Sequence, residues 1–276
     1  MAFVGDSVGR NQMQSLMCLL SVVAYPNDIS GRYTLHPYST AWFYDDYNFT
    51  LATFWSTFLV RDSDADPNGQ SYNSIMNLYL DEVDRSWAVQ IENYDYVIIS
   101  AGQWFNRPQI FYESGQIVGC HNCNNKNITD LKNYYGLKKA LQTAFKTLRD
   151  LKGYKGVTIL RTYSPQHFEN GPWNNGGSCG RTRPFTPEEK RLDGYILEAY
   201  LSQKEAFGAE EKEARKKGLK FWLLDISELM ILRPDGHPNK YGRSRDKNMT
   251  VNDCVHWCMP GPIDTWNEFL LYLMKM

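Results

Sequence analysis

Four short apolar runs constrain the fold of this chain more strongly than any other feature. They occupy residues 2–5, 94–100, 156–162 and 220–226, and each is short enough to form one buried strand. Segments with helical periodicity separate them, and alternating strands and helices are typical of a parallel sheet covered on both sides. We therefore predict an α/β fold with a doubly wound, mostly parallel sheet, helices on both faces and long loop insertions.

The segments between the runs carry apolar side chains at spacings of three and four residues. This periodicity predicts helices over residues 8–23, 130–151 and 263–274. A stretch rich in aromatic and β-branched residues, 41–60, predicts an extra strand or hairpin. Asn- and Gly-rich residues 122–127 and 170–180 predict long loops, where binding residues often lie.

A further helix is predicted from Thr186 to about Lys217. The sequence Thr-Pro-Glu-Glu that begins at Thr186 combines an N-cap, a proline at the first helical position and a capping-box glutamate. Gly218 is the expected stop, because glycine readily takes the left-handed conformation that ends many helices.

Composition excludes several classes of protein. The chain has 276 residues, 30 Lys and Arg against 31 Asp and Glu, and a net charge of −1, which leaves no electrostatic case for nucleic-acid binding. A hydrophobic content of 42% excludes a disordered chain, and no apolar run reaches the length of a membrane span. We see no domain boundary and expect one domain over residues 1–276, acting as a monomer.

The N-terminal residues have the pattern of a buried strand, and no signal peptide precedes them in this sequence. This indicates either a cytosolic protein or a fragment that lacks its natural N-terminus. Three N-x-[ST] sequons, at Asn48, Asn127 and Asn248, favour the secretory pathway and are candidate glycosylation sites.

The six cysteines allow two interpretations. In an oxidising lumen an even number predicts disulfides, and we take all six as candidates: Cys18, Cys120, Cys123, Cys179, Cys254 and Cys258. The alternative is a zinc site, since Cys120-x-x-Cys123 and the Cys254-to-Cys258 segment around His256 supply metal-ligand types at suitable spacing. The sequons favour disulfides, and no metal is expected.

A serine lies where the first strand turns into the first helix, in Gly5-Asp6-Ser7. Open α/β sheets bind ligands at this edge, and a helix N-terminus stabilises a developing oxyanion. Arg10 and Asn11 follow one turn later and could donate hydrogen bonds to the same place. The competing interpretation is structural, with Asp6 or Ser7 acting only as an N-cap.

A serine nucleophile needs a base and an acid that orients it. Asp253-x-x-His256 can present both from one short loop after a late strand, which returns to the same edge of the sheet as Ser7. His237 lies in a turn-like segment and is the second candidate base. We favour His256 over His237.

Two long blocks of this sequence carry a family resemblance. Residues 3–12, FVGDSVGRNQ, and residues 253–268, DCVHWCMPGPIDTWNE, resemble the signature blocks of the plant trichome birefringence-like polysaccharide O-acetyltransferases. That family is related in fold to the GDSL/SGNH esterases. The similarity continues through residues 100–105 and 161–165. Family members are longer and carry an N-terminal membrane anchor and a cysteine-containing segment, so the resemblance implies an N-terminally truncated chain.

The resemblance implies roles for individual residues. Ser7 would be the nucleophile, His256 the general base and Asp253 its orienting acid, while Arg10 and Asn11 would help to hold the oxyanion. The family's middle block often has histidine where this chain has Gln103, which could donate a hydrogen bond but could not act as a base.

The cysteines also take their roles from the resemblance. Cys254 and Cys258 would be disulfide cysteines, and Cys18 would pair with a cysteine in the absent segment. That leaves an odd number of cysteines, so one pairing stays unexplained.

The implied reaction is acetyl transfer through an acetyl-serine, in the Golgi lumen, by a type II membrane protein. The partners are an acetyl donor of unknown identity and a polysaccharide acceptor, and no cofactor is bound. Residues 120–139 resemble the branch linked to xyloglucan or mannan more than the xylan branch. Trp104, Trp173 and Trp257 are candidates for sugar contacts, although most tryptophans belong to cores. The alternatives are an acetylesterase, a non-catalytic polysaccharide-binding protein and a zinc-binding module.

Overall fold

The computed structural model describes residues 1–33, 36–66, 74–242 and 252–276. A seven-stranded sheet has the strand order β11-β10-β7-β1-β4-β3-β2. Its five parallel strands are β11 (Lys220–Leu224), β10 (Val157–Arg161), β7 (Tyr96–Ser100), β1 (Ala2–Gly5) and β4 (Phe49–Trp55). The four predicted apolar runs all contribute strands to it, and the prediction of a mostly parallel sheet is confirmed.

The predicted hairpin at residues 41–60 completes this sheet. Strand β3 (Thr40–Tyr44) pairs antiparallel with β4, and β2 (Asn27–Asp28) pairs antiparallel with β3. The turn between β3 and β4 contains a short 3₁₀ helix, η2 (Asp45–Tyr47), and ends at Asn48, which takes a left-handed conformation.

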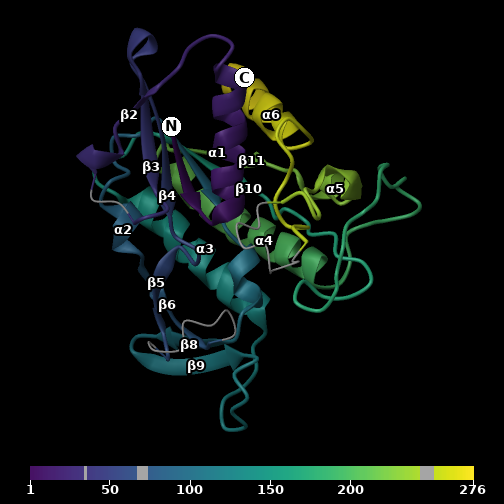
Figure 1. Ribbon diagram of the computed structural model, residues 1–276. Coiled ribbons are helices and arrows are strands. Elements are labelled where there is room, and N and C mark those ends of the chain that lie inside the picture. The colour runs from purple at the N-terminus through teal and green to yellow at the C-terminus, as the bar shows by residue number, and fades with distance from the viewer. Residues whose placement is uncertain (34–35, 67–73, 243–251) are drawn as a thin grey trace.

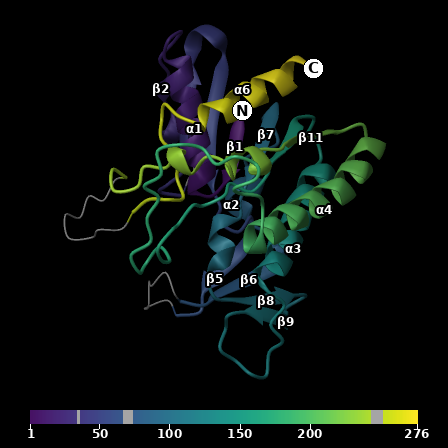
Figure 2. The same ribbon diagram turned by 90° about the vertical axis from the view of Figure 1, so that its right-hand side faces the viewer.

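Helices cover both faces of the sheet, as predicted (Figures 1 and 2). Helices α1 (Ser7–Leu20) and α6 (Asp264–Lys275) lie on one face, and α3 (Asn133–Asp150) and α4 (Gly194–Lys216) lie on the other. Alternate side chains of each strand point to opposite faces of the sheet and join the core on that face. In β1, Ala2 and Val4 join the core beneath α3 and α4, whereas Phe3 joins the core beneath α1 and α6.

The long helix was predicted to begin too early. Residues near Thr186 do form one capped turn, in which the Thr186 backbone N–H donates to Glu189 Oε2 over 2.8 Å. Helix α4, however, begins only at Gly194, whose φ of +48° interrupts a continuous helix. The predicted stop is confirmed, since Gly218 has a φ of +73° directly after the helix.

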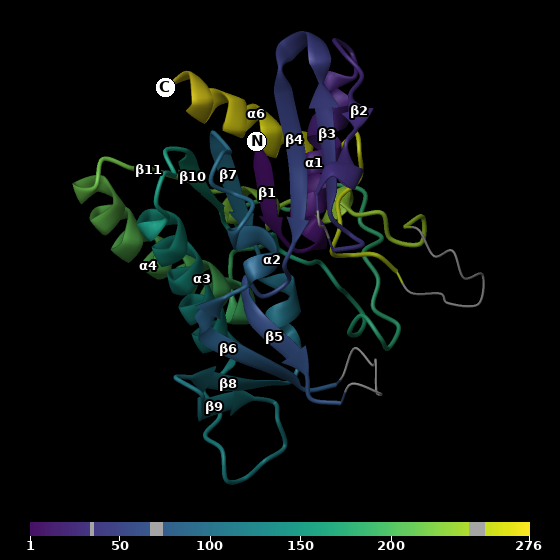
Figure 3. The same ribbon diagram turned by 90° about the vertical axis from the view of Figure 1, so that its left-hand side faces the viewer.

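A second, four-stranded sheet was not predicted. Its strand order is β5-β6-β8-β9, and it lies beyond the carboxyl ends of the parallel strands (Figure 3). Met76, Leu78 and Leu80 alternate as buried residues along one strand, a period-two signal that the sequence does carry. The strands are β5 (Val60–Asp64), β6 (Met76–Val83), β8 (Gln109–Glu113) and β9 (Gln116–His121).

Short helices connect these layers: α2 (Arg85–Ala88), α5 (Ser227–Met230), η1 (Ser30–Arg32), η3 (Gln103–Asn106) and η4 (Pro234–Gly236). The two predicted loops, residues 122–127 and 170–180, contain no helix or strand. Across the described ranges, no helix is both long and apolar enough to span a lipid bilayer. The turn from β1 into α1, η3 after β7 and the segments after β10 and β11 all gather at one edge of the larger sheet.

Candidate active site

Ser7 is the first residue of α1 and lies at the carboxyl edge of the central strand β1. Asp6 is the N-cap, and its Oδ1 accepts a 3.0 Å hydrogen bond from the Val8 backbone N–H. The turn requires glycine at position 5, because a Cβ there would lie 1.8 Å from the Ser100 carbonyl oxygen. The structural interpretation of Asp6 as an N-cap is therefore confirmed, and it leaves the hydroxyl of Ser7 available at the helix N-terminus.

Ser7, His256 and Asp253 form a continuous hydrogen-bonded series. The Ser7 Oγ lies 2.7 Å from His256 Nε2, and His256 Nδ1 lies 3.0 Å from Asp253 Oδ2. The histidine and the carboxylate come from one short loop. His256 follows Ser7 by 249 residues in the sequence. The sequence prediction that these three residues meet is confirmed by their positions.

The charge on Asp253 fixes the tautomer of His256. Burial opposes ionisation of Asp253, but hydrogen bonds from His256 and from the backbone N–H groups of Val255 and His256 outweigh it and lower the pKa to about 2. An ionised carboxylate can only accept hydrogen bonds, so His256 Nδ1 carries the proton. The lone pair on Nε2 then faces the Ser7 hydroxyl, which is the arrangement that general-base catalysis needs.

A buried pair of charges lies beneath the serine. Asp6 is 2% exposed and also accepts a hydrogen bond from the Gln103 backbone N–H over 3.2 Å. Burial raises the pKa of Asp6, whereas the positive charge of Arg161 and the backbone N–H groups oppose that change. Arg161 is 2% exposed and donates to Thr162 O and Ser100 Oγ. Asp6 thus ties the start of α1 to the turn after β7.

Asn11 fastens the histidine loop to α1. Its Oδ1 accepts from the Trp257 backbone N–H over 2.8 Å, and its Nδ2 donates to the Trp257 carbonyl over 3.2 Å. The side chain is 6% exposed, so both ends of the amide are committed to this clamp. One N–H of the Asn11 amide thus serves the residue next to His256, and the expectation that Asn11 donates to an oxyanion stays a prediction.

A disulfide and a two-strand bridge hold the same loop from the other side. Cys254 is bonded to Cys179, which lies 75 residues earlier. Asp253 and Asn239 exchange two backbone hydrogen bonds of 2.9 and 3.0 Å. The acid is therefore held through its own backbone and through the residue that follows it.

His237, the second candidate base, has a structural place. Its Nδ1 contacts the His256 carbonyl at 2.7 Å, and its Nε2 contacts His167 Nδ1 at 2.7 Å. Burial lowers the pKa of His237 to about 3, and the neighbouring His167 acts in the same direction. Both ring nitrogens are engaged away from Ser7, so His237 supports the loop and His256 alone faces the nucleophile.

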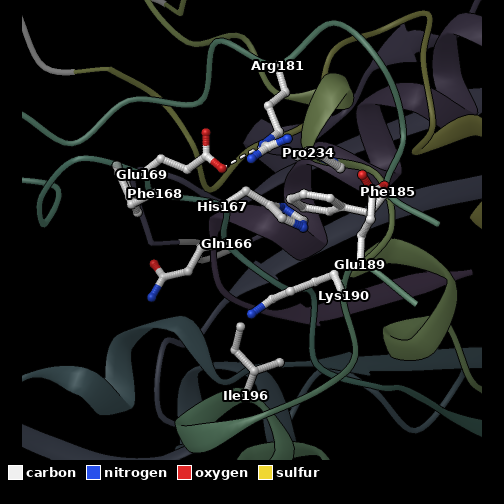
Figure 4. Close-up of a pocket in the computed structure, with 10 residues that line it drawn as sticks. All are labelled: Gln166, His167, Phe168, Glu169, Arg181, Phe185, Glu189, Lys190, Ile196 and Pro234. Carbon is white, nitrogen blue, oxygen red and sulfur yellow. Dashed lines mark hydrogen bonds and ion pairs between the residues drawn. The ribbon is translucent and has the colours of Figure 1, made fainter. Parts of the chain in front are cut away.

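A cavity of about 470 Å³ adjoins His167 (Figure 4). His167 forms part of its wall, together with the ion pair between Arg181 and Glu169 at 2.6 Å. Lys190 also lines it and is paired with Asp193 at 2.8 Å. The cationic groups of this cavity are thus compensated by carboxylates.

Residues 1–273 match the family PC-Esterase, the GDSL/SGNH-like acyl-esterase family found in Pmr5 and Cas1p. The chain belongs to this family. It is 49% identical over 276 residues to "Protein trichome birefringence-like 19" of Arabidopsis thaliana, with all of this chain and 64% of the relative covered. It is 42% identical over 277 residues to "Xyloglucan O-acetyltransferase 4" of Populus trichocarpa, again over all of this chain and 64% of the relative.

A third relative, "Xyloglucan O-acetyltransferase 1" of Arabidopsis thaliana, is 38% identical over 280 residues, all of this chain and 64% of the relative. The PC-Esterase chain thus spans less than two thirds of the length of these curated relatives. The predicted family and the predicted SGNH-like fold are both confirmed.

Two of the predicted support residues make contacts that the sequence did not show. The Gln103 side chain donates to the Ser164 carbonyl over 2.6 Å and accepts from the Tyr163 hydroxyl over 2.9 Å. It therefore braces the turns after β7 and β10. The Arg10 guanidinium lies over the ring of Trp55, with 5.2 Å between Cζ and the ring centroid, so this side chain contacts an aromatic residue that sequence reasoning missed.

The three candidate tryptophans fall into different environments. Trp257 is 2% exposed, packs against Trp266 and His237, and donates to Ser164 Oγ over 2.7 Å. The expectation that it contacts sugar is wrong, because it belongs to the core that carries the histidine loop. Trp104 is half-buried and Trp173 is 38% exposed, so both stay candidates.

Four cysteines form two disulfides, one between neighbours in the sequence and one between distant residues. Cys120 is bonded to Cys123, as a local pair. Cys258 has a free thiol, so the expectation that it is a disulfide cysteine is wrong. Cys254 is a disulfide cysteine, as expected, and its partner is Cys179 from a loop distant in sequence. Cys18 is free and exposed in this chain, and its predicted partner outside the chain stays a prediction.

Disulfides occupy three of the four thiols of the zinc alternative, those of Cys120, Cys123 and Cys254. In the part of the chain that the structure describes, no three His, Cys, Asp or Glu side chains gather as metal ligands. Asn48 and Asn127 are exposed, as glycosylation requires, while Asn248 lies outside the described residues.

Proposed function

We propose that this chain is the catalytic part of an O-acetyltransferase that moves an acetyl group onto hydroxyls of a plant cell-wall hemicellulose through an acetyl-serine intermediate. The observation that carries the proposal is the hydrogen-bonded series from Ser7 through His256 to Asp253. Membership of an acyl-esterase family and relatives named xyloglucan O-acetyltransferases support the same chemistry.

In the first step the Ser7 Oγ attacks the acetyl carbonyl of the donor, and its proton passes to His256 Nε2. The developing imidazolium is stabilised by the ionised Asp253, whose pKa of about 2 keeps it charged. The bond from Ser7 Oγ to the acetyl carbon forms, the bond from that carbon to the leaving atom of the donor breaks, and His256 returns the proton to the leaving group.

The oxyanion of this step needs donors that other contacts leave available. We assign the backbone N–H of Ser7 to this role, because it is the first N–H of α1, where the helix dipole favours negative charge. Asp6 already takes the Val8 N–H, and Asn11 and Gln103 hold neighbouring turns.

In the second step a sugar hydroxyl takes the place of the leaving group of the donor. His256 Nε2 removes its proton, the hydroxyl oxygen attacks the acetyl carbon, and Ser7 leaves with the returned proton. We propose xyloglucan or mannan as the acceptor ahead of xylan, supported by relatives that are named for xyloglucan. Water in place of the sugar hydroxyl would make the same site an acetylesterase.

We further propose that residues 1–276 form one catalytic domain that works as a monomer in the Golgi lumen, held there by a membrane anchor outside this chain. The disulfides Cys179–Cys254 and Cys120–Cys123 support an oxidising compartment. The exposed sequons at Asn48 and Asn127 support the same location.

The proposal is tested by intact-mass analysis and peptide mapping after incubation with an activated acetyl ester. We expect one acetyl adduct on the Ser7 peptide, which is discharged by xyloglucan or mannan oligosaccharide. Ser7→Ala should abolish the adduct and reduce turnover by at least about a thousandfold, with the melting temperature unchanged. Ser21→Ala is the matched control, because Ser21 lies at the far end of α1 and its hydroxyl donates to the local Cys18 carbonyl.

The outcomes separate the candidate functions. Discharge of the adduct only into water would establish an esterase. A folded chain that binds oligosaccharide but never forms the adduct would establish a non-catalytic binding protein and overturn the proposal.

A further inference from the structure

Four aromatic side chains stand together beside Ser7, and none of them belongs to the triad. We call them the aromatic wall: His36, Tyr38, Trp55 and Trp104. Trp55 is the centre, with ring centroids 5.1 Å from Tyr38, 6.2 Å from His36 and 6.2 Å from Trp104. Tyr38 and Trp104 meet Trp55 edge-on, which is a favoured geometry for aromatic pairs.

The wall is held in place by backbone contacts. The Trp55 backbone N–H donates to Ser39 Oγ over 2.8 Å, and the Ser39 N–H donates to the His36 carbonyl over 2.7 Å. The Tyr38 N–H donates to His36 Nδ1 over 3.3 Å. The segment that carries His36 and Tyr38 is therefore fastened to the end of β4, and the rings need little ordering when a ligand binds.

The wall lies at the same sheet edge as the nucleophile. Trp55 ends β4 directly opposite Gly5 in the parallel register, and the next residue, Ser56, donates its N–H to the Gly5 carbonyl over 2.9 Å. Trp104 follows Gln103, whose N–H bonds Asp6. The wall is thus anchored to both residues that precede Ser7.

Arg10 joins the wall to the helix that carries Ser7. Its guanidinium lies 5.2 Å from the ring centroid of Trp55 and 5.7 Å from that of Tyr38. Residues three apart on a helix are neighbours on its surface, with Cβ atoms about 5–6 Å apart, so Arg10 stands next to Ser7. Its N–H groups supply hydrogen-bond donors beside the apolar rings.

Apolar ring faces next to fixed donors match the chemistry of a pyranose ring, which has an apolar face of C–H groups and a rim of hydroxyls. Tyr38 is 57% exposed, so its ring is open to a ligand that extends over the surface. An acetyl group has no such extended face. These features therefore fit the acceptor chain better than the acetyl donor.

We propose that the aromatic wall, with Arg10 at its edge, is the subsite that stacks a sugar ring of a neutral polysaccharide acceptor and presents its hydroxyl to the acetyl group on Ser7. This inference rests on the proposed function. It adds the residues that let a sugar hydroxyl react with the acetyl-serine faster than water does in the second step. A stacked ring holds its hydroxyl next to the acetyl group, whereas no such contact holds a water molecule there.

The experiment separates the two half-reactions in the purified chain. Formation of the Ser7 adduct from an activated acetyl ester measures the first step. Transfer to a xyloglucan oligosaccharide against release of free acetate measures the second, and calorimetric titration with the same oligosaccharide measures binding. The variants are Tyr38→Ala, Trp55→Ala and the conservative Trp55→Phe. Tyr272→Ala is the matched control, because Tyr272 is 66% exposed on α6, outside the wall.

We expect Tyr38→Ala and Trp55→Ala to raise the KM and the Kd for the oligosaccharide about tenfold and to shift acetyl discharge towards water. The rate of adduct formation should stay within about twofold, and Trp55→Phe should retain most of the binding, because a ring still stacks. Tyr38 is surface-exposed, so its variant remains informative where Trp55→Ala folds poorly.

Unchanged oligosaccharide affinity and unchanged partition in Tyr38→Ala and in a folded Trp55→Ala, with normal adduct formation, would overturn this inference and leave the proposed function intact. A wild-type chain that forms no adduct would overturn the proposed function. The binding titration would then still decide whether the wall holds sugar.

Discussion

The two halves of the Ser7–His256–Asp253 series are held in different ways. Ser7 lies on regular structure: it begins α1, follows the central strand β1, and is placed by hydrogen bonds within those elements. Asp253 and His256 lie on an irregular segment and are held by bonds to distant parts of the chain. A residue on a helix start inherits its position from the fold, whereas a residue on a loop needs ties of its own.

Because of this difference, the loss of a single contact should displace Asp253 and His256 more readily than Ser7. Removing one helical contact near Ser7 leaves a buried strand and a helix of 14 residues to hold it. The loop has a few identifiable ties, which are the Cys179–Cys254 disulfide, the Asn11 clamp and the hydrogen bonds to Asp253. Each tie can be cut separately, and the loss in each case should fall on the acid–base half.

Cutting the disulfide should have the largest effect. The Cys179→Ser, Cys254→Ser double variant releases a cross-link between residues 75 apart, and we expect the free energy of unfolding to fall by about 4 kcal/mol. The matched control is Cys120→Ser with Cys123→Ser, which opens a link between residues only three apart and should cost about 2 kcal/mol.

Urea unfolding measures both variants, and adduct formation on Ser7 gives the activity of each. The Cys120 and Cys123 variant should keep full activity, since that pair lies in the β9 region and not in the histidine loop. Equal losses of stability and activity in the two double variants would contradict the comparison.

The strands and the three residues of the series could be predicted because their signals are local. Apolar runs predicted the strands, a strand-to-helix turn indicated Ser7, and Asp253-x-x-His256 placed acid and base in one loop. The role of Asn11 could not be predicted in the same way. Its clamp joins residues 246 apart in sequence, and spacing carries no information about such a contact.

The cysteine pairing and the second sheet could not be predicted for related reasons. Cys254 pairs with Cys179 while Cys258 keeps a free thiol, because the chain returns from a distant loop and local spacing does not show that return. The second sheet had a readable signal in the alternating burial of Met76 and Leu78, but the sheet forms only through pairings with β5 and β8. Trp257 looked like a loop residue and is core, because the loop itself is packed.

Removing the Asn11 clamp should have the next largest effect. Asn11→Ala leaves the buried N–H and carbonyl of Trp257 without partners, and we expect the free energy of unfolding to fall by about 3 kcal/mol. Because Trp257 follows His256 directly, the base should also shift, and kcat should fall by about 10- to 100-fold with little change in KM for the acetyl donor.

Gln14→Ala is the matched control, since Gln14 is exposed on the same helix. Steady-state kinetics and thermal unfolding measure both variants. Full kcat in a destabilised Asn11→Ala chain would show that the clamp stabilises the loop without positioning His256.

The smallest effect is expected from protonation of Asp253. Its pKa is lowered from 3.8 to about 2, so the stabilisation is complete above pH 4 and is lost as the pH falls through 2. The difference in unfolding free energy between the wild-type chain and Asp253→Asn should therefore shrink by about 2 kcal/mol from pH 5 to pH 2.

Asp150→Asn is the control, because hydrogen bonds from Arg149 and Lys217 lower the pKa of Asp150 while its side chain is 39% exposed. Added salt should weaken the Asp150 difference and leave that of Asp253 nearly unchanged, because the carboxylate of Asp253 is held by short hydrogen bonds in a partly buried site. If salt abolished both differences equally, Asp253 would be held by surface electrostatics, and the ties that distinguish the loop from the helix start would be those of Asn11 and Cys254.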